Sequence, residues 1–529
     1  MPTDCISYQK SGYFSKLIVD YLDEKPELAT LYNHLPKIEN FKKQIEEKAG
    51  NFNGSDKREV LVRELEKQYE GVSISVETKK NIQSLLNSKT FTVTTGHQLN
   101  LFTGPLYFLY KIASTINLCT ELKEAYPEHE FVPIYWMATE DHDFEEINHF
   151  NFKGKNIHWN KPSSGPVGRL STEGLDEILA VFTLELGSGN NANEIKKLFQ
   201  EAYLNHPTLT EATRYLANTF FSEYGLVILD GDSKALKQQF TSYIKEELIH
   251  QSSNKLVLET IEKLQDYTIQ VNPREINLFY IEDDLRERIL FEDGTYKVNN
   301  TDIAFTETEI LAVLQSNPEK FSPNVILRPL YQEVVLPNLC YIGGGGEIAY
   351  WLELKSVFDF HNVTFPSLLI RNSVVLVSEK QQSKIDKLGL NWSELFLKQQ
   401  ELITRKTKEL SSFPIDLSVQ KLHLEQQFET LEKIALQTDK SFTGAVHAQK
   451  TKQINGLENL EKRLLKAQKR KFTDELHRII SIQNELFPNQ SLQERQLNFS
   501  EFYLNNGRFI SLILKQLHPL DNHFLIFID

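Results

Sequence analysis

Four consecutive polar residues place three carboxylates around one imidazole. Glu140, Asp141, His142 and Asp143 come just after an apolar run that ends at Ala138. The carboxylates could raise the basicity of the imidazole and orient it, or could bind a divalent cation. An acidic helix start is the alternative, because Asp and Glu are favoured in a first turn. An imidazole flanked on both sides by Asp is more than a helix cap needs, so we predict acid–base chemistry or Mg²⁺ binding, the latter through Asp141 and Asp143.

A second polar segment spans residues 95–105 and follows a short β-branched run. The threonine or glycine before Pro105 can cap a helix that begins there, and the free amides of that helix end would attract an anion. His97 and Gln98 would then serve as hydrogen-bond donors to charge that develops on a phosphoryl or acyl group. A glycine turn with a polar helix cap is the alternative. The candidate residues of this segment are Gly96, His97, Gln98, Thr103 and Gly104.

Four successive glycines precede a further helical run. Such a run lets the backbone approach a ligand closely and point its amides at it. The segment matches neither G-x-x-x-x-G-K-[ST] nor G-x-G-x-x-G, so taken alone it favours a flexible turn over a nucleotide site. The candidate binding residues here are Gly343, Gly344, Gly345, Gly346 and Glu347.

Three arginines lie next to predicted strands or their ends. A guanidinium at such a place can hold a carboxylate with two hydrogen bonds. A structural salt bridge is the alternative for each of Arg274, Arg328 and Arg371.

The order of helices and strands indicates where these residues must lie. Residues 1 to about 88 have helical spacing, which indicates a helical N-terminal lead-in. Strand-sized apolar runs follow at 91–95, 131–138, 226–230, 325–327 and 368–370. Because helix-like segments alternate with these runs, we predict an α/β fold with an open parallel sheet and inserted segments. Ligands bind beyond the carboxyl ends of the strands in such a sheet, where the first two polar segments fall.

The last third of the chain has the pattern of long polar helices. No proline interrupts residues 415–487, and the register of the apolar positions breaks near Gly444. We predict an arm over 376–490 that forms an antiparallel hairpin with the helix at 378–411, and a segment at 491–529 that docks on the core. The a/d spacing of a coiled coil is carried by Leu424, Phe428, Leu431, Ala435, Thr438 and Phe442.

Composition limits the classes of partner. The chain has 529 residues, 58 Lys and Arg against 72 Asp and Glu, and a net charge of −14, which argues against nucleic acid or anionic membranes as partners. Cys5, Cys119 and Cys340 include no C-x-x-C pair, so they build neither a disulfide scaffold nor a zinc module. No basic stretch with a following apolar run begins the chain, and no run approaches the roughly 18 apolar residues of a membrane helix. We expect a cytoplasmic protein.

Taken together, the segments resemble the bacillithiol biosynthesis cysteine-adding enzyme family over essentially the whole chain. The resemblance implies a Rossmann-like core over 1–375, similar to nucleotidylyltransferases, with inserted connective segments and a C-terminal coiled coil that supports a homodimer. Two positions differ: His97 stands where many relatives have a second glutamine, and Gly345 where they often have proline. The matching stretches are 95–98 with 101–107, 135–146, 273–274 with 277–279, 322–329 and 343–351.

The resemblance implies an enzyme that joins cysteine to the amine of glucosaminyl malate, the last step of bacillithiol synthesis. Joining a carboxylate to an amine in water is uphill, so we expect an activated carboxyl group made from ATP, with Mg²⁺ as its companion ion. A nucleotidylyltransferase-like enzyme acting on another substrate and a non-enzymatic coiled-coil scaffold that binds a small ligand are the alternatives. The residues expected to contact substrate or nucleotide also include Glu140, Arg274, Asn277 and Arg328, the two arginines as clamps for the malyl carboxylates.

Overall fold

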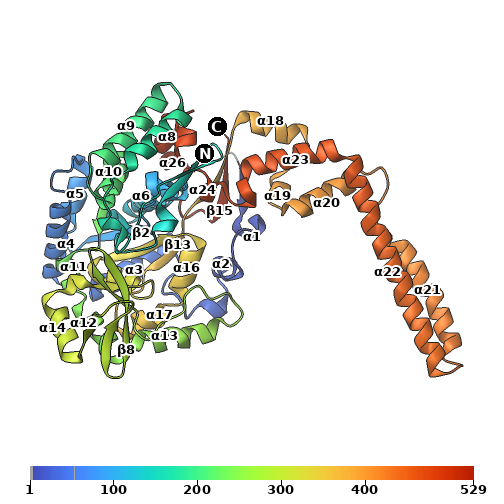
Figure 1. Cartoon of the computed structure of the whole chain (residues 1–529), viewed down its shortest axis with the longest axis horizontal. Helices are drawn as coiled ribbons and strands as arrows, with labels where there is room; N and C mark the ends of the chain where they lie inside the picture. Colours follow the sequence, from blue (N-terminus) through green and yellow to red (C-terminus); the bar gives the residue numbers. More distant parts are fainter. Residues whose placement is uncertain (1–3, 53, 529) are drawn as a thin grey trace. The chain divides into compact units, whose positions relative to one another are not determined.

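Residues 4–52 and 54–528 are described by a computed structural model, and their contacts divide the chain into two units (Figure 1). The core unit contains residues 4–9, 13–375 and 493–525. The arm unit contains residues 10–12, 376–492 and 526–528. The arm unit is thus an insertion, because the chain leaves the core unit at residue 375 and enters it again at residue 493.

A five-stranded parallel sheet lies at the centre of the core unit. From edge to edge the strand order is β13-β12-β2-β3-β6, and every neighbouring pair is parallel. Numbered along the chain, these strands follow the order 5-4-1-2-3, which is the doubly wound arrangement of a Rossmann-like fold. The predicted α/β fold with a parallel sheet is confirmed. The strands are β2 (Thr90–His97), β3 (Glu130–Met137), β6 (Val227–Asp230), β12 (Asn338–Gly343) and β13 (Ser367–Ile370).

Strand β2 can lie in the middle of this sheet because none of its residues must be exposed to solvent. All eight of its residues are buried, and three of its threonine hydroxyl groups find partners inside the sheet. Thr94 Oγ1 donates to Asn338 Oδ1 at 2.8 Å, and Thr95 Oγ1 donates to the Ile342 carbonyl at 2.8 Å. Helix α6 (Tyr107–Ala125) packs against β2 and β3 with twelve buried residues, which is why its sequence is apolar nearly all round.

One strand predicted for the parallel sheet is wrong, and one strand of that sheet was not predicted. Residues 325–327 are not a strand: they lead into helix α15 (Arg328–Val335), and the neighbouring strand is β11 (Phe321–Pro323). Asn324 Oδ1 accepts from the Ile326 amide at 2.9 Å, so this segment turns at the asparagine and becomes a helix. Strand β12 was missed because its six residues run directly into the glycines.

The core unit contains further helices, and helices α2–α5 form the predicted helical lead-in. The helices are α2 (Lys16–Leu22), α3 (Phe41–Asn51), α4 (Ser55–Gln68), α5 (Val76–Ser84), α7 (Phe144–Ile147), α8 (Leu175–Leu186), α9 (Asn190–Leu204), α10 (Leu209–Phe221), α11 (Lys234–Gln238), α12 (Thr241–His250), α13 (Ser252–Ile261), α14 (Glu307–Ser316), α16 (Gly345–Leu352), α17 (Lys355–Phe360), α24 (Gln493–Gln496), α25 (Ser500–Tyr503) and α26 (Phe509–Gln516). The short helix α1 is Tyr8–Ser11.

Three smaller sheets complete the list of strands. An antiparallel sheet has the order β10-β9-β8-β7-β11, β4 pairs with β5, and a third sheet has the order β1-β15-β14. Their bounds are β1 (Asp4–Ser7), β4 (His149–Phe152), β5 (Lys155–His158), β7 (Leu278–Glu282), β8 (Leu285–Glu292), β9 (Thr295–Val298), β10 (Ala304–Phe305), β14 (Ser373–Val377) and β15 (His523–Ile528).

The arm unit is helical and contains the predicted antiparallel hairpin, but with a different partner helix. Helices α21 and α22 pack together. The turn between them lies at 436–439, and α22 continues through Gly444, where the apolar register breaks. Asp439 caps α22 by accepting from the Phe442 amide at 2.9 Å. The predicted partner at 378–411 is instead three short helices, of which α20 packs on α22 and α23. The helices are α18 (Glu379–Lys387), α19 (Trp392–Leu395), α20 (Gln399–Leu410), α21 (Ser418–Ala435), α22 (Lys440–Lys471) and α23 (Thr473–Leu486).

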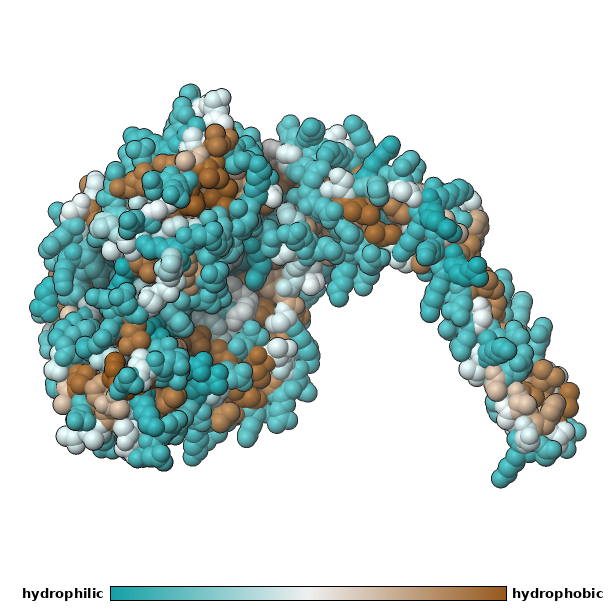
Figure 2. Space-filling model, in the orientation of Figure 1, coloured by the Kyte–Doolittle hydropathy of each residue, from teal (hydrophilic) through white to brown (hydrophobic). Residues whose placement is uncertain are grey.

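Apolar side chains gather at the end of this hairpin, which Figure 2 shows in brown. Leu431, Ile434, Leu436 and Phe442 are between 44% and 75% exposed, whereas the buried cluster between the two helices contains Phe428, Ala435 and Val446. The homodimer through the coiled coil stays a prediction. Within the described residues, no helix is both long enough and apolar enough to cross a membrane.

Candidate active site at the carboxyl ends of the parallel strands

The segment after β2 and the glycine loop after β12 meet at one point of the sheet. Strands β2 and β12 are neighbours, but the chain continues from β2 through α6 to β3 on one side and from β12 through α16 to β13 on the other. Such a switch in direction opens a crevice at the carboxyl ends of the two strands, where ligands of Rossmann-like proteins bind. The 96–98 segment and the glycine loop at 343–346 both begin there.

The loop that follows β2 does not form the predicted helix cap. Phe102, Thr103 and Gly104 all have positive φ angles, of 48°, 67° and 60°, and helix α6 begins only at Tyr107, without a side-chain cap. The Gly104 amide donates to the Leu101 carbonyl at 2.9 Å, so it is not free to bind an anion. The prediction of Thr103 or Gly104 as the cap of a helix from Pro105 is therefore wrong.

Contacts from distant segments hold this loop in its strained shape. The Phe102 amide donates to Tyr203 Oη at 2.6 Å. Asn498 Nδ2 donates to the carbonyls of Phe102 and Gly104 at 2.8 and 2.6 Å. Backbone strain of this kind persists only where the surrounding structure fixes it, and it is concentrated at functional sites.

His97 is a neutral hydrogen-bond acceptor, not the predicted donor. Its side chain is 6% exposed and stacks on Tyr107, and burial together with the charge of Lys111 lowers the pKa of His97 to about 3. Nδ1 lies 2.8 Å from the Gln98 carbonyl. Because a carbonyl only accepts, the proton is on Nδ1 and Nε2 carries a lone pair. Nε2 is buried and has no hydrogen-bond partner among the described residues.

Gln98 and Asn100 likewise present acceptors. Gln98 Nε2 donates to Asp141 Oδ2 at 2.5 Å, and Asn100 Nδ2 donates to the Glu146 carbonyl at 3.2 Å. Their other amide atoms, Gln98 Oε1 and Asn100 Oδ1, are buried and unpaired in the part of the chain that the structure describes. The loop after β2 therefore offers lone pairs to a ligand, so the predicted donor roles of His97 and Gln98 are reversed.

Buried cations also lie at this crevice. Lys111 Nζ lies 2.5 Å from Glu347 Oε2 and donates to the Gly96 carbonyl at 2.8 Å. Arg328 Nη2 donates to Tyr350 Oη at 2.6 Å, and Arg328 Nη1 would lie 3.7 Å from a Cβ placed on Gly96. Burial lowers the pKa of Arg328, but the nearby tyrosines and Glu347 outweigh it, so its pKa is raised and the charge is kept.

Arg371 is the third of these buried cations. Its Nη2 donates to Glu494 Oε1 at 2.7 Å, and its guanidinium lies 5.1 Å from the centre of the Tyr107 ring. Its Nε is buried and has no acceptor within the described residues. A Cβ placed on Gly344 would lie 3.8 Å from that Nε, so the free N–H faces the glycine loop.

The glycine loop forms the start of helix α16 and is capped by the next side chain. Glu347 Oε2 accepts from the Gly344 amide at 2.9 Å, and its Oε1 accepts from Tyr341 Oη at 2.7 Å. The Gly343 carbonyl accepts from the Arg371 amide, which ties the loop to β13. Gly345 is the first residue of the helix, where proline is also favoured. The departure from the family pattern at Gly345 therefore leaves the helix start intact.

The acidic cluster after β3 joins the site through Asp141. Besides Gln98, Asp141 contacts Arg286 Nη1 at 3.5 Å. Burial raises the pKa of Asp141, but hydrogen bonds from His142 and the charge of Arg286 outweigh it, so its pKa is lowered. His142 is about half exposed, and its Nδ1 accepts from Arg286 Nη1 at 2.6 Å. The cluster is thus held by an arginine that the sequence reasoning missed.

Two members of the acidic cluster have structural partners. Asp143 caps helix α7 by accepting from the Glu146 amide at 3.3 Å. Glu140 forms an ion pair with Lys237, whose side chain is 1% exposed. The described residues contain no group of three His, Cys, Asp or Glu side chains that could hold a metal ion. Mg²⁺ binding through Asp141 and Asp143 stays a prediction.

Arg274 and Asn277 lie just before β7. Arg274 is exposed. Asn277 is fully buried, and its Nδ2 donates to Ser253 Oγ at 2.7 Å and to Glu247 Oε1 at 3.2 Å. Asn277 thus has a structural role, because it satisfies a buried carboxylate.

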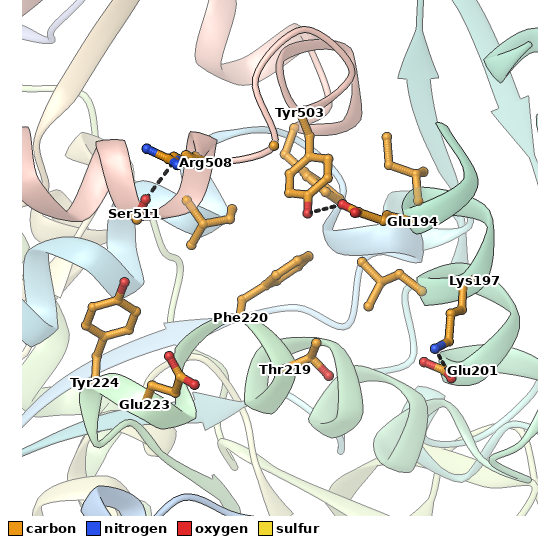
Figure 3. Close-up of a pocket in the computed structure, with 15 residues that line it drawn as sticks. Glu194, Lys197, Glu201, Thr219, Phe220, Glu223, Tyr224, Tyr503, Arg508 and Ser511 are labelled. Atoms are coloured by element: carbon orange, nitrogen blue, oxygen red, sulfur yellow. Dashed lines mark hydrogen bonds and ion pairs between the residues drawn. The ribbon is translucent and has the colours of Figure 1, made fainter. Parts of the chain in front are cut away.

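Two cavities of the core unit differ in their relation to these residues. One of about 260 Å³ is lined by Gln98, Asn100 and Tyr107. Another, of about 440 Å³, lies among α9, α10 and the 499–511 segment and contains none of the predicted site residues (Figure 3). There, Tyr503 Oη donates to Glu194 Oε2 at 2.9 Å, and none of the side chains that line it has a buried, unpaired polar atom. The smaller cavity therefore belongs to the candidate site.

The site residues that the sequence reasoning missed are Asn100, Tyr107, Lys111, Arg286, Tyr341 and Glu494. The sequence could have indicated Lys111, because it is a charged residue within an apolar helical run. It is 4% exposed, and lysine is almost never fully buried without a partner. Glu494 left none, since 123 residues separate it from Arg371.

The sheet order and the crevice define a Rossmann-like protein with a ligand site at its switch point. Residues 1–372 match the family model "Bacillithiol biosynthesis BshC, N-terminal Rossmann-like domain", and residues 374–528 match "Bacillithiol biosynthesis BshC, C-terminal coiled-coil domain". The chain belongs to the bacillithiol biosynthesis BshC family.

Relatives match over nearly their whole length. Proteins from Flavobacterium psychrophilum and Flavobacterium johnsoniae are 68% and 64% identical over 527 residues, and one from Christiangramia forsetii is 55% identical over 533, each alignment covering 99% of both chains. All three carry the name "Putative cysteine ligase BshC". A solved chain described as a putative arginyl tRNA synthetase from Campylobacter jejuni covers 84% of this chain and 98% of its own, with a TM-score of 0.23 at 10% identity, which carries no weight here.

Proposed function

We propose that this chain is a cysteine ligase that joins the carboxyl group of cysteine to the amine of glucosaminyl malate, the last step of bacillithiol synthesis. The names of its relatives support a cysteine ligase. The observation that carries the proposal is that the switch-point crevice presents both buried acceptors and buried cations. An amide-forming ligase needs both, because it must hold an N–H donor against an activated, anionic acyl group.

The buried cations suit the acyl group and its leaving group. Lys111 pairs with Glu347 of helix α16, Arg328 donates to Tyr350, and the N–H of Arg371 Nε is free to donate among the described residues. Charge that develops on a carbonyl or phosphoryl oxygen is best stabilised by such fixed donors in a site that excludes water. ATP as the activating substrate fits these cations, since its phosphates are anionic.

The hydrogen-bond acceptors in the loop after β2 suit the amine of glucosaminyl malate. The nitrogen lone pair attacks the activated carboxyl carbon, the C–N bond forms, the bond to the phosphate-bearing oxygen breaks, and the nitrogen releases a proton to water. His97 Nε2 orients the amine by accepting one of its N–H groups. With a pKa of about 3, His97 is too weak a base to hold the proton near neutral pH.

Reconstitution with the purified full chain tests the function. We expect bacillithiol by mass spectrometry only when cysteine, glucosaminyl malate and Mg·ATP are all present, with ADP or AMP as the second product. Pyrophosphate release that does not depend on cysteine would instead indicate a nucleotidylyltransferase acting on another substrate.

Two variants connect the function to the crevice. His97→Ala should lower kcat/KM about 100-fold, as expected when a reacting group loses its orientation. His447→Ala removes an exposed histidine of helix α22 in the arm unit and should change kcat/KM less than twofold. A folded His97→Ala variant with full activity would show that the reaction takes place elsewhere. His142→Ala separates acid–base work by the acidic cluster from a purely structural role of that cluster.

A further inference from the structure

The cavity of about 260 Å³ beside the switch point is a built site. Its walls come from the loop after β2, from helix α7 and strand β4, and from helix α24. The volume lies just below the roughly 300–1,000 Å³ that is usual for drug-sized ligands, so it fits one small ring or chain. The cavity and the crevice share Gln98 and Tyr107, and His97 stacks on Tyr107 with ring centres 5.2 Å apart.

Two amide side chains present oxygen atoms for which the described residues provide no donor. Their orientation is fixed, because Gln98 Nε2 donates to a carboxylate oxygen of Asp141 and Asn100 Nδ2 donates to the backbone carbonyl of Glu146, and both partners only accept. Gln98 Oε1 and Asn100 Oδ1 are consequently the free ends, and both atoms are buried. Asn100 as a whole is 9% exposed.

Buried acceptors without donors are rare in folded proteins and cost free energy until a donor reaches them. Here both residues line the same cavity. Their loop is held in a conformation with three successive positive φ angles, so the chain supports the strained shape that keeps the two oxygens in place. A ligand for this cavity must therefore bring N–H or O–H groups.

The walls select among donor-bearing molecules. Tyr107 and Phe150 provide aromatic surface, the Glu146 carboxylate adds a further acceptor, and Arg495 adds one cation. Several hydroxyl groups on a ring with apolar C–H faces satisfy the acceptors and the aromatic surface. Cysteine offers only an ammonium and a thiol as donors besides its carboxyl group, which is fewer donor groups than an amino sugar brings.

We propose that this cavity binds the amino-sugar ring of the acceptor substrate, with Gln98 Oε1 and Asn100 Oδ1 accepting hydrogen bonds from the sugar's hydroxyl or amine groups. The proposal rests on the function proposed above and specifies which part of the site holds which substrate. The amine of the bound sugar then lies on the same side of the crevice as His97 Nε2.

Calorimetric titrations of the full chain with glucosaminyl malate, and separately with cysteine, test the proposal without turnover. In Asn100→Ala and in Gln98→Met we expect the Kd for glucosaminyl malate to rise at least tenfold, while the Kd for cysteine changes less than twofold. Asn193→Ala, which removes an exposed amide on α9, is the matched control and should bind like the unchanged protein. Glucosamine alone should compete with glucosaminyl malate.

Unchanged affinity for glucosaminyl malate in both folded variants would overturn the proposal, as would a loss that falls on cysteine instead. If neither variant folds, a crystal of the unchanged protein soaked with glucosaminyl malate decides, since a sugar ring outside the Gln98–Asn100 cavity is incompatible with it. Failure of the proposed function is distinguishable, because the unchanged protein would then make no bacillithiol while its binding of the amino sugar could still be measured.

Discussion

The ring of His97 lies between Tyr107 and Phe108, at centre distances of 5.2 and 5.0 Å. Burial and the charge of Lys111 oppose protonation of this ring, which lowers the pKa of His97 to about 3. In the unfolded chain a histidine has a pKa of about 6.5. Between these values the unfolded state binds a proton that the folded state does not, so acid favours unfolding.

This pKa difference predicts how stability depends on pH. From pH 7 to pH 5 the folded state should lose about 2 kcal/mol through His97 alone, at about 1.4 kcal/mol per pH unit below pH 6.5. His97→Gln removes the titrating group and should flatten the dependence by that amount. Urea denaturation followed by tryptophan fluorescence at pH 5, 6 and 7 measures it. Equal slopes for the two proteins would mean that His97 is protonated in the folded state.

The pair of Lys111 and Glu347 supports a second prediction. Their side chains are 5% and 26% exposed. Lys111→Met should destabilise the core unit by about 2–3 kcal/mol, toward the low side of the range for a buried pair because Glu347 is partly solvated. The double variant Lys111→Met with Glu347→Gln should recover at least half of that loss, since no uncompensated charge remains. Denaturant midpoints of the four proteins of this cycle give the coupling, and strictly additive effects would contradict it.

At the scale of elements, the connection from β2 to α6 determines where the acceptors lie. Gly104 has φ +60°, and a Cβ placed there would lie 2.6 Å from Asn100 Cβ. Gly154, in the turn between β4 and β5, has φ +76° and no atom within 4 Å of its virtual Cβ. The two glycines thus share a positive φ angle but differ in how closely other atoms surround them.

Comparison of Gly104→Ala with Gly154→Ala separates these effects. Both should lose about 1 kcal/mol because alanine disfavours positive φ. Gly104→Ala should lose a further 1–3 kcal/mol by overpacking and should bind glucosaminyl malate more weakly, because Asn100 must move. Thermal denaturation and calorimetric titration measure the two effects, and equal stability of the two variants would contradict the crowding at Gly104.

Sequence patterns were sufficient where an element is long or apolar on both faces. Strands β2 and β3 and the helical arm were predicted from their periodicity. The positions of the loops were predicted too, because polar segments follow strand ends. Whether His97 and Gln98 act as donors or acceptors toward a ligand was not predicted. That role depends on which carbonyl or carboxylate accepts each N–H group. That choice is made by tertiary contacts, which leave no local pattern.

At the scale of the whole molecule, the proposed reaction needs none of the three cysteines as a nucleophile. Cys119 and Cys340 are buried and Cys5 is exposed, and burial raises the thiol pKa values of the two buried residues. In the proposed reaction the thiol belongs to the substrate.

A thiol count tests this arrangement. Ellman's reagent should react with one thiol per folded chain and with three after denaturation, because buried, protonated thiols are poor nucleophiles. Cys5→Ser should leave a protein with no rapidly reacting thiol and with unchanged bacillithiol formation. Rapid labelling of two or three thiols in the folded chain would contradict the burial of Cys119 and Cys340.

The path of the chain also bears on when the site is completed during synthesis. Arg371 emerges from the ribosome 123 residues before Glu494, the partner of its guanidinium, and the loop at 102–104 waits for Asn498 in the same way. Until the last segment of the core unit has been made, a cation of the crevice lacks its counter-charge and the loop after β2 lacks its clamp. A nascent chain can therefore fold its arm before its crevice, and a chain that stops short of residue 494 leaves the ribosome with the crevice unfinished.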